Sequence, residues 1–92
     1  MVEVEILTLK KRNILIGTTP IIKDFIGDFP VIIIKRENLN KNSWEILQDA
    51  YCVDILSKDK LMTTAINLEF LTREMKKVGV EVEIQKVKFE VL

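Results

Sequence analysis

The sequence predicts a small α+β domain, a two-layer sandwich with helices packed on one face of a mixed, largely antiparallel sheet of four to five strands. Three observations predict this class. Residues 2–9 and 80–91 alternate between apolar and polar side chains, with the period of a half-buried strand. Residues 31–34 are four consecutive β-branched side chains, typical of a strand covered on both faces. Residues 58–78 have the apolar spacing of a long helix.

Length and composition predict one globular domain, residues 1–92. A chain of 92 residues has no room for a second core, and its 48% hydrophobic and 30% charged residues are typical of a folded protein. The longest apolar run, Val31 to Ile34, is far shorter than the ~18 residues that cross a membrane. The N-terminal segment is acidic where a signal peptide would be basic, and Cys52 has no second cysteine to pair with. We therefore expect a cytosolic protein.

The residue inventory excludes several kinds of chemistry. The chain has no histidine and one cysteine, which removes Ser-His-Asp and Cys-His catalysis, histidine-ligated zinc and cysteine-rich metal sites. Carboxylates, lysines, hydroxyls and backbone dipoles remain. We therefore expect no catalytic residues, no cofactor and no metal, and favour a protein that is not an enzyme. The abundance of Ile, Lys and Glu is typical of a thermophile, although an AT-rich genome produces the same Ile and Lys bias.

The first third of the chain predicts a hairpin and a short helix. Residues 2–9 and 14–16 read as antiparallel strands joined by a polar loop. Thr19 and Pro20 then favour an N-cap and a first helical residue, with Gly27 ending the helix in a left-handed conformation. The alternative is that residues 21–26 form another strand.

A second helix is expected in the middle of the chain, after a polar loop at residues 36–41. Asn42, with Glu45 three residues later, resembles a capping box for a helix that runs through Ala50. Residues 51–56 either extend this helix or form a strand, because their apolar positions fit both periods.

The longest helix is predicted over residues 58–78. Ser57 is a suitable N-cap, and Asp59 lies favourably in the first turn. The pair Lys76-Lys77 and then Gly79 predict its C-terminal end, with cations at the negative end of the dipole and glycine in the C′ position.

The last segment predicts one long bent strand. Its apolar positions shift by one residue at Gln85-Lys86, and a two-residue hairpin there would need a positive φ that these residues do not favour. A β-bulge at this point is the better account, because one inserted residue keeps the apolar face on the core.

The favoured functional hypothesis is a protein-interaction or self-associating domain, in its simplest form a homodimer. On the predicted 58–78 helix, Met62, Ile66 and Phe70 form a second apolar line besides the one that faces the sheet. A helix with two apolar stripes is buried on both sides, by its own chain or by another. We therefore assign these three residues to an interface with a second copy or a protein partner.

Two alternatives use other residues. Gly17, Thr18 and Thr19 would present backbone N–H groups and hydroxyls at a helix N-terminus, which is what a phosphate or carboxylate requires, although no P-loop glycine pattern or lysine accompanies them. A plain turn with a helix cap explains the same residues. A nucleic-acid module using Lys10, Lys11 and Arg12 is the weaker alternative, because fourteen basic residues are balanced by fourteen acidic ones.

Overall fold

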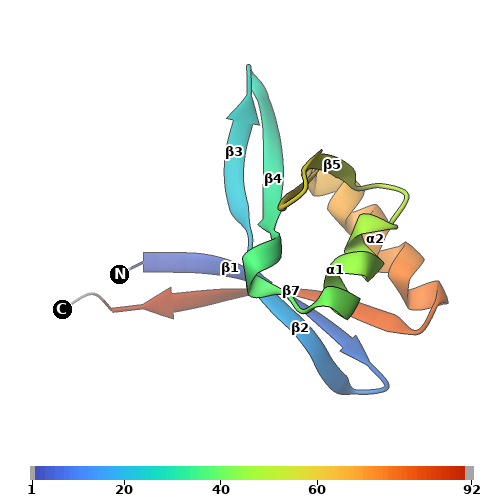
Figure 1. Cartoon of the computed structure of the whole chain (residues 1–92). Coiled ribbons are helices and arrows are strands. Elements are labelled where there is room, and N and C mark those ends of the chain that lie inside the picture. The colour runs from blue at the N-terminus through green and yellow to red at the C-terminus, as the bar shows by residue number, and fades with distance from the viewer. Residues whose placement is uncertain (1, 91–92) are drawn as a thin grey trace.

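The computed structural model describes residues 2–90, and over this range the protein is an α+β fold with two α-helices and seven strands. In chain order the elements are β1 (Val2–Lys11), β2 (Ile14–Pro20), β3 (Ile22–Ile26), β4 (Phe29–Lys35), the short 3₁₀ helix η1 (Arg36–Asn38), α1 (Lys41–Gln48), β5 (Asp54–Ser57), β6 (Lys60–Thr63), α2 (Ala65–Lys77) and β7 (Val80–Phe89). Figure 1 shows their arrangement. The predicted α+β class is confirmed. The single mixed sheet is wrong, because the strands form two sheets in which every pairing is antiparallel.

The first sheet has the strand order β2-β1-β7. The expected hairpin between β1 and β2 is confirmed, and its two-residue loop, Arg12 and Asn13, takes positive φ values of 52° and 64°. Two such residues are what a type I′ hairpin turn requires. The register moves from Leu9 opposite Gly17 to Lys10 opposite Leu15, so Ile16 is the extra residue of a β-bulge.

β1 and β7 pair without interruption, from Val2 opposite Phe89 to Lys11 opposite Val80. One long strand is therefore confirmed for the end of the described chain. The β-bulge expected at Gln85-Lys86 is wrong, because no register shift occurs there.

The change in the apolar positions along β7 coincides with a similar change in its partner strand, β1. In β1 the apolar positions change from even to odd numbers between Ile6 and Leu7, and these two lie opposite Gln85 and Ile84, where β7 changes. Both strands therefore change their apolar face at the same point of the ribbon. On one side of this point Leu7 is fully buried, and on the other side the ribbon extends away from the helices (Figure 1).

The second sheet has the order β3-β4-β6-β5. The strand predicted at 31–34 is confirmed as the central β4, in which Val31, Ile32 and Ile34 are buried. The helix predicted after Pro20 is wrong, and the alternative strand at 21–26 is the correct one. Gly27 does take the left-handed φ of 61°, but it ends a strand: it opens the two-residue loop between β3 and β4, the glycine position of a type II′ turn.

The expected helix over 58–78 divides into a hairpin and a shorter helix. Ser57 accepts a hydrogen bond from the Asp59 N–H at 3.3 Å, which closes the β5–β6 turn rather than capping a helix. The N-cap of α2 is Thr64, whose hydroxyl accepts from the Asn67 N–H at 3.2 Å. The predicted C-terminal end is confirmed, with Gly79 at a φ of 81°.

The middle segment also differs in detail. α1 is capped by Asn40 rather than Asn42, with the Asn40 side chain accepting from the Ser43 N–H at 2.8 Å. The helix ends at Gln48 instead of Ala50. The ambiguous segment after it is a turn followed by β5, so the strand alternative is the correct one there.

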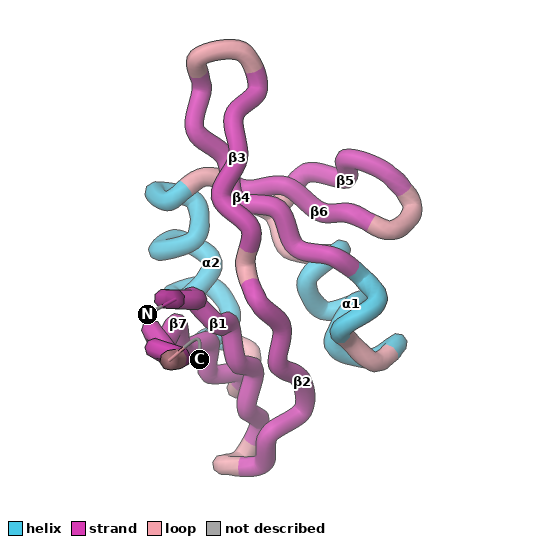
Figure 2. The backbone as a smooth tube through the Cα atoms, turned by 90° about the vertical axis from the view of Figure 1, so that its left-hand side faces the viewer, coloured by secondary structure: helices cyan, strands magenta, loops and turns pink. Residues whose placement is uncertain are grey.

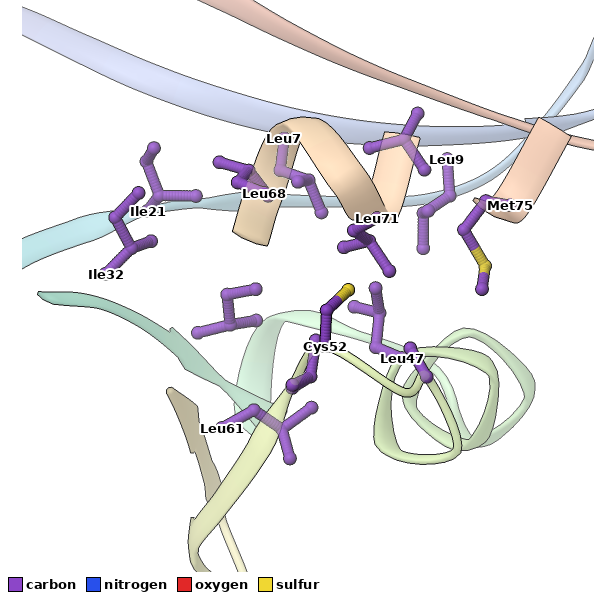
Figure 3. Close-up of a cluster of buried hydrophobic side chains, with 14 of the residues drawn as sticks. Leu7, Leu9, Ile21, Ile32, Leu47, Cys52, Leu61, Leu68, Leu71 and Met75 are labelled. Carbon is purple, nitrogen blue, oxygen red and sulfur yellow. The ribbon is translucent and has the colours of Figure 1, made fainter. Parts of the chain in front are cut away.

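One continuous core joins both sheets and both helices. Figure 3 shows the side chains pointing into it, among them Leu7 of β1, Ile32 of β4, Leu47 of α1, Leu61 of β6 and Leu71 of α2. Four of these five are fully buried, and Ile32 is nearly so. The β3–β4 hairpin, in contrast, projects beyond this core (Figure 2).

Candidate functional site

Gly17, Thr18 and Thr19 do not form a loop at a helix N-terminus. They lie inside β2, where they pair with Leu9, Thr8 and Leu7 of β1, and the chain continues into β3. Thr19 is buried and its hydroxyl donates to the carbonyl of the next residue at 3.1 Å. The structural basis of the predicted anion site is therefore absent.

Gly17 has a packing role instead. Asn40 Nδ2 and Ser43 Oγ both donate to the carbonyl oxygen of Ile16, at 2.8 and 2.6 Å, and so attach α1 to the bulge of β2. A Cβ on Gly17 would lie 2.6 Å from Ser43 Oγ. Glycine at this position avoids that clash, because a side chain here would force Ser43 to move.

Met62, Ile66 and Phe70 do not form one stripe, because the helix begins three residues after Met62. Met62 lies on β6, half-buried, between Ile33 of β4 and Asp54 of β5. Phe70 is partly buried against the core, and its ring centroid lies 6.3 Å from that of Tyr51. Ile66, in the first turn of α2, is 79% exposed. Of the three predicted interface residues, only Ile66 presents a largely uncovered apolar side chain.

Ile66 lies beside an apolar surface that sequence reasoning did not find. Phe25 and Phe29, at the projecting end of the β3–β4 hairpin, are 66% and 60% exposed. Between this hairpin and the start of α2 runs a groove of about 630 Å³, which we call the hairpin groove. Its lining residues are Lys23, Asp24, Phe25, Phe29, Pro30, Val31, Ile32, Thr64, Ala65 and Ile66.

The polar groups of the hairpin groove are engaged within the chain. Lys23 Nζ donates to Glu5 at 2.9 Å and so ties β3 to β1. Asp24 Oδ1 accepts from the backbone N–H of Phe25 at 2.7 Å. β3 is an edge strand, and this carboxylate occupies one of its backbone donors. What the groove offers to a partner is therefore mainly its apolar side chains.

Charged residues at the β1–β2 turn do not form a concentrated basic patch. Lys10 lies 3.8 Å from Glu83 of β7, and Lys11 and Arg12 are exposed in the turn. A second basic cluster consists of Lys35, Arg36 and Lys60, which meet where β4 ends and β6 begins, although they are far apart in the sequence.

Cys52 is a buried thiol of the core. Burial raises the pKa of Cys52 above its ordinary value, and the carboxylate of Glu74 contributes in the same direction, against a backbone hydrogen bond that lowers it. The neutral thiol is therefore favoured at neutral pH, which makes Cys52 a poor nucleophile.

Within residues 2–90, no set of metal-ligating side chains comes together, and neither α-helix has the length and apolar character needed to cross a membrane. No protein-family model matches the sequence, and no curated protein or solved structure is significantly similar to it.

The hairpin groove has a signal in the sequence that can be recognised afterwards. The two phenylalanines flank Gly27-Asp28, a glycine-first pair that is typical of a tight hairpin loop. Phe29 directly follows this pair and Phe25 lies two residues before it, so both strands carry an aromatic residue close to the turn, which predicts an apolar tip. What the sequence does not reveal is that this tip lies beside the first turn of α2.

Proposed function

We propose that this protein is a small self-associating domain, and that its partner at the hairpin groove is a second copy of the same chain. The observation that carries the proposal is the cluster of exposed apolar side chains, Phe25, Phe29 and Ile66, around one groove. Large apolar side chains exposed singly are common on protein surfaces, whereas exposed apolar side chains that cluster around one groove favour an interaction site.

The energy gained by burying this surface is of the same order as the cost of association. An apolar side chain moved fully from water into a packed contact contributes about 1.5–3 kcal/mol. In a two-fold dimer each chain contributes the same three residues, so six side chains are buried in total. Even when reduced for the part of each side chain already buried, this total is comparable with the ~4–15 kcal/mol that association costs in rigid-body freedom.

A second copy is favoured over a partner of different chemistry for electrostatic reasons. The chain has no net formal charge, so two copies do not repel each other. The groove contains one cation and one carboxylate, Lys23 and Asp24, and therefore selects neither an acidic nor a basic partner. The Asp24 contact to the Phe25 N–H also favours association through side chains rather than through an added β-strand.

Sedimentation at micromolar concentration tests the proposal directly. We expect the wild type to sediment as a dimer, and Phe25→Glu and Ile66→Glu each to sediment as a single chain with an unchanged circular dichroism spectrum. Ile14→Glu is the matched control, because Ile14 has the same 66% exposure as Phe25 but lies on the other hairpin. A monomeric wild type, or an Ile14→Glu variant that dissociates as fully as Phe25→Glu, contradicts the proposal.

We further propose that the domain is not an enzyme and that it is located in the cytosol. The absence of histidine and the buried state of the one thiol support the first. The lone cysteine supports the second.

A further inference from the structure

Basic side chains that form no ion pair with a described carboxylate come together where β4 ends and β6 begins. Lys35 and Lys60 lie directly opposite each other in the antiparallel register, and Arg36 follows Lys35. Like charges in directly opposed positions destabilise a sheet. Among the side chains that the structure describes, none of these three has a carboxylate oxygen within 4.0 Å.

These cations line an open pocket of about 670 Å³. Lys35, Arg36, Lys41 and Lys60 contribute its positive charge, and Glu37 and Asp59 its negative charge. Lys41 lies 3.9 Å from Glu45 on the same helix, so its charge is partly compensated. The volume is within the range of ~300–1,000 Å³ typical of small-ligand sites.

Two contacts hold the pocket in place. The guanidinium of Arg36 lies over the ring of Trp44, 5.9 Å from its centroid, and Trp44 is itself buried. The backbone N–H of Arg36 donates to the carbonyl oxygen of Asp59 at 2.9 Å, which fixes η1 against the β5–β6 turn. The arginine is thus oriented before any ligand arrives, which reduces the entropy lost on binding.

We infer that this pocket is a binding site for a small phosphate-bearing ligand. Arginine presents a planar set of donors that matches two phosphate oxygens, and the two lysines of the same pocket supply further positive charge. A bound phosphate group relieves the repulsion between Lys35 and Lys60, so the feature that destabilises the free protein strengthens the complex. This site is separate from the hairpin groove and does not depend on self-association.

The test uses inorganic pyrophosphate as the probe, measured by titration calorimetry near physiological salt. We expect saturable binding to the wild type, and binding at least about tenfold weaker, equivalent to about 1.4 kcal/mol, for the double variant Lys35→Gln/Lys60→Gln. The matched control is Lys11→Gln/Arg12→Gln, which removes the same charge from the β1–β2 turn. This control is expected to bind within about twofold of the wild type.

Two further measurements separate the site from general electrostatics. Lys35→Gln alone is expected to raise the urea midpoint of unfolding while weakening pyrophosphate binding, which a misfolded variant would not do. Arg36→Lys keeps the charge and is expected to weaken binding because the planar donor set is lost.

Three results would overturn the inference: no saturable binding to the wild type, equal weakening in both double variants, or tighter binding of a short single-stranded oligonucleotide than of pyrophosphate. The last would assign the cluster to a nucleic-acid backbone instead of a small ligand.

Discussion

Ser43 lies so close to Gly17 that a methyl group on the glycine would approach Ser43 Oγ to 2.6 Å and Ser43 Cβ to 2.9 Å. The serine cannot easily turn aside, because the same Oγ donates to the Ile16 carbonyl at 2.6 Å. Helix α1 and strand β2 are thus held together by the hydrogen bond from Ser43, and their close approach is possible because residue 17 has no side chain.

The first prediction concerns this contact. Gly17→Ala is expected to lower the free energy of unfolding by about 1–3 kcal/mol, as overpacking does elsewhere. In a strand with open space the same change would be neutral or stabilising. Urea unfolding measures the loss, and the double variant Gly17→Ala/Ser43→Gly identifies its cause. If the two losses simply add, the contact with Ser43 is not the source.

The second prediction separates the observed helix cap from the one expected from sequence. Asn40→Ala removes two hydrogen bonds of 2.8 Å, one that caps α1 and one to the Ile16 carbonyl, and should cost about 1–2 kcal/mol. Asn42→Ala, two residues later on the exposed first turn of α1, should change stability by less than about 0.5 kcal/mol. Chemical denaturation of both variants gives the comparison. Equal losses of stability in the two variants would show that Asn40 is not the N-cap of α1.

A third prediction distinguishes Phe70 from Ile66, which sequence analysis assigned to one surface. Phe70→Glu places a charge against the core and Tyr51, and should lower the free energy of unfolding by about 2–3 kcal/mol. Ile66→Glu should change it by less than about 0.5 kcal/mol, because the side chain is exposed and a carboxylate is favourable in the first turn of a helix. Both are measured at a concentration where the wild type is monomeric. Severe destabilisation by Ile66→Glu would show that this side chain is covered within its own chain.

The fourth prediction follows from the raised pKa of Cys52. The folded state holds the thiol proton more tightly than the unfolded state, so this contribution to stability is complete below the ordinary pKa of 9.0. It is lost as the pH rises through the higher pKa of the folded protein. Between about pH 7 and about pH 10 the wild type should therefore lose more stability than Cys52→Ala, in paired urea titrations. Equal losses would mean that other groups account for the alkaline decline.

The elements predicted correctly from sequence are those in which neighbouring residues all favour the same conformation. The alternation in β1, the β-branched run in β4, and the lysines and glycine at the end of α2 each specify their structure with residues close in sequence. The helix caps predicted at serine and threonine residues, in contrast, were wrong. Ser57 and Thr19 carry the side chains of an N-cap, but a serine or threonine hydroxyl satisfies a turn or a neighbouring backbone group equally well. Tertiary pairing decided between these outcomes.

The candidate sites depend more strongly on such pairing. Ile66 was assigned from sequence to an interface, but as part of a stripe that required a longer helix. Phe25 and Phe29 become a site because their hairpin projects beside α2. The cluster of Lys35 with Lys60 exists only through the β4–β6 register, which joins residues 25 positions apart in the numbering. Contacts between elements that are distant in the sequence create both candidate sites, and the pattern of neighbouring residues does not predict such contacts.

The pairing of β1 with β7 has a consequence for the order of folding. Leu7 and Leu9, fully buried in the core, belong to the first of the described strands, and β7 is the last of the described strands to be synthesised. Until then β1 has only β2 beside it, and the core lacks Val80 and Val82. Contacts this distant along the chain incur a large loop-closure entropy before they stabilise anything, which slows folding relative to helical domains of the same size. During synthesis β1 and its hairpin therefore remain without their β7 partner while residues 21–79 are being made, and the native first sheet closes only after β7 has emerged.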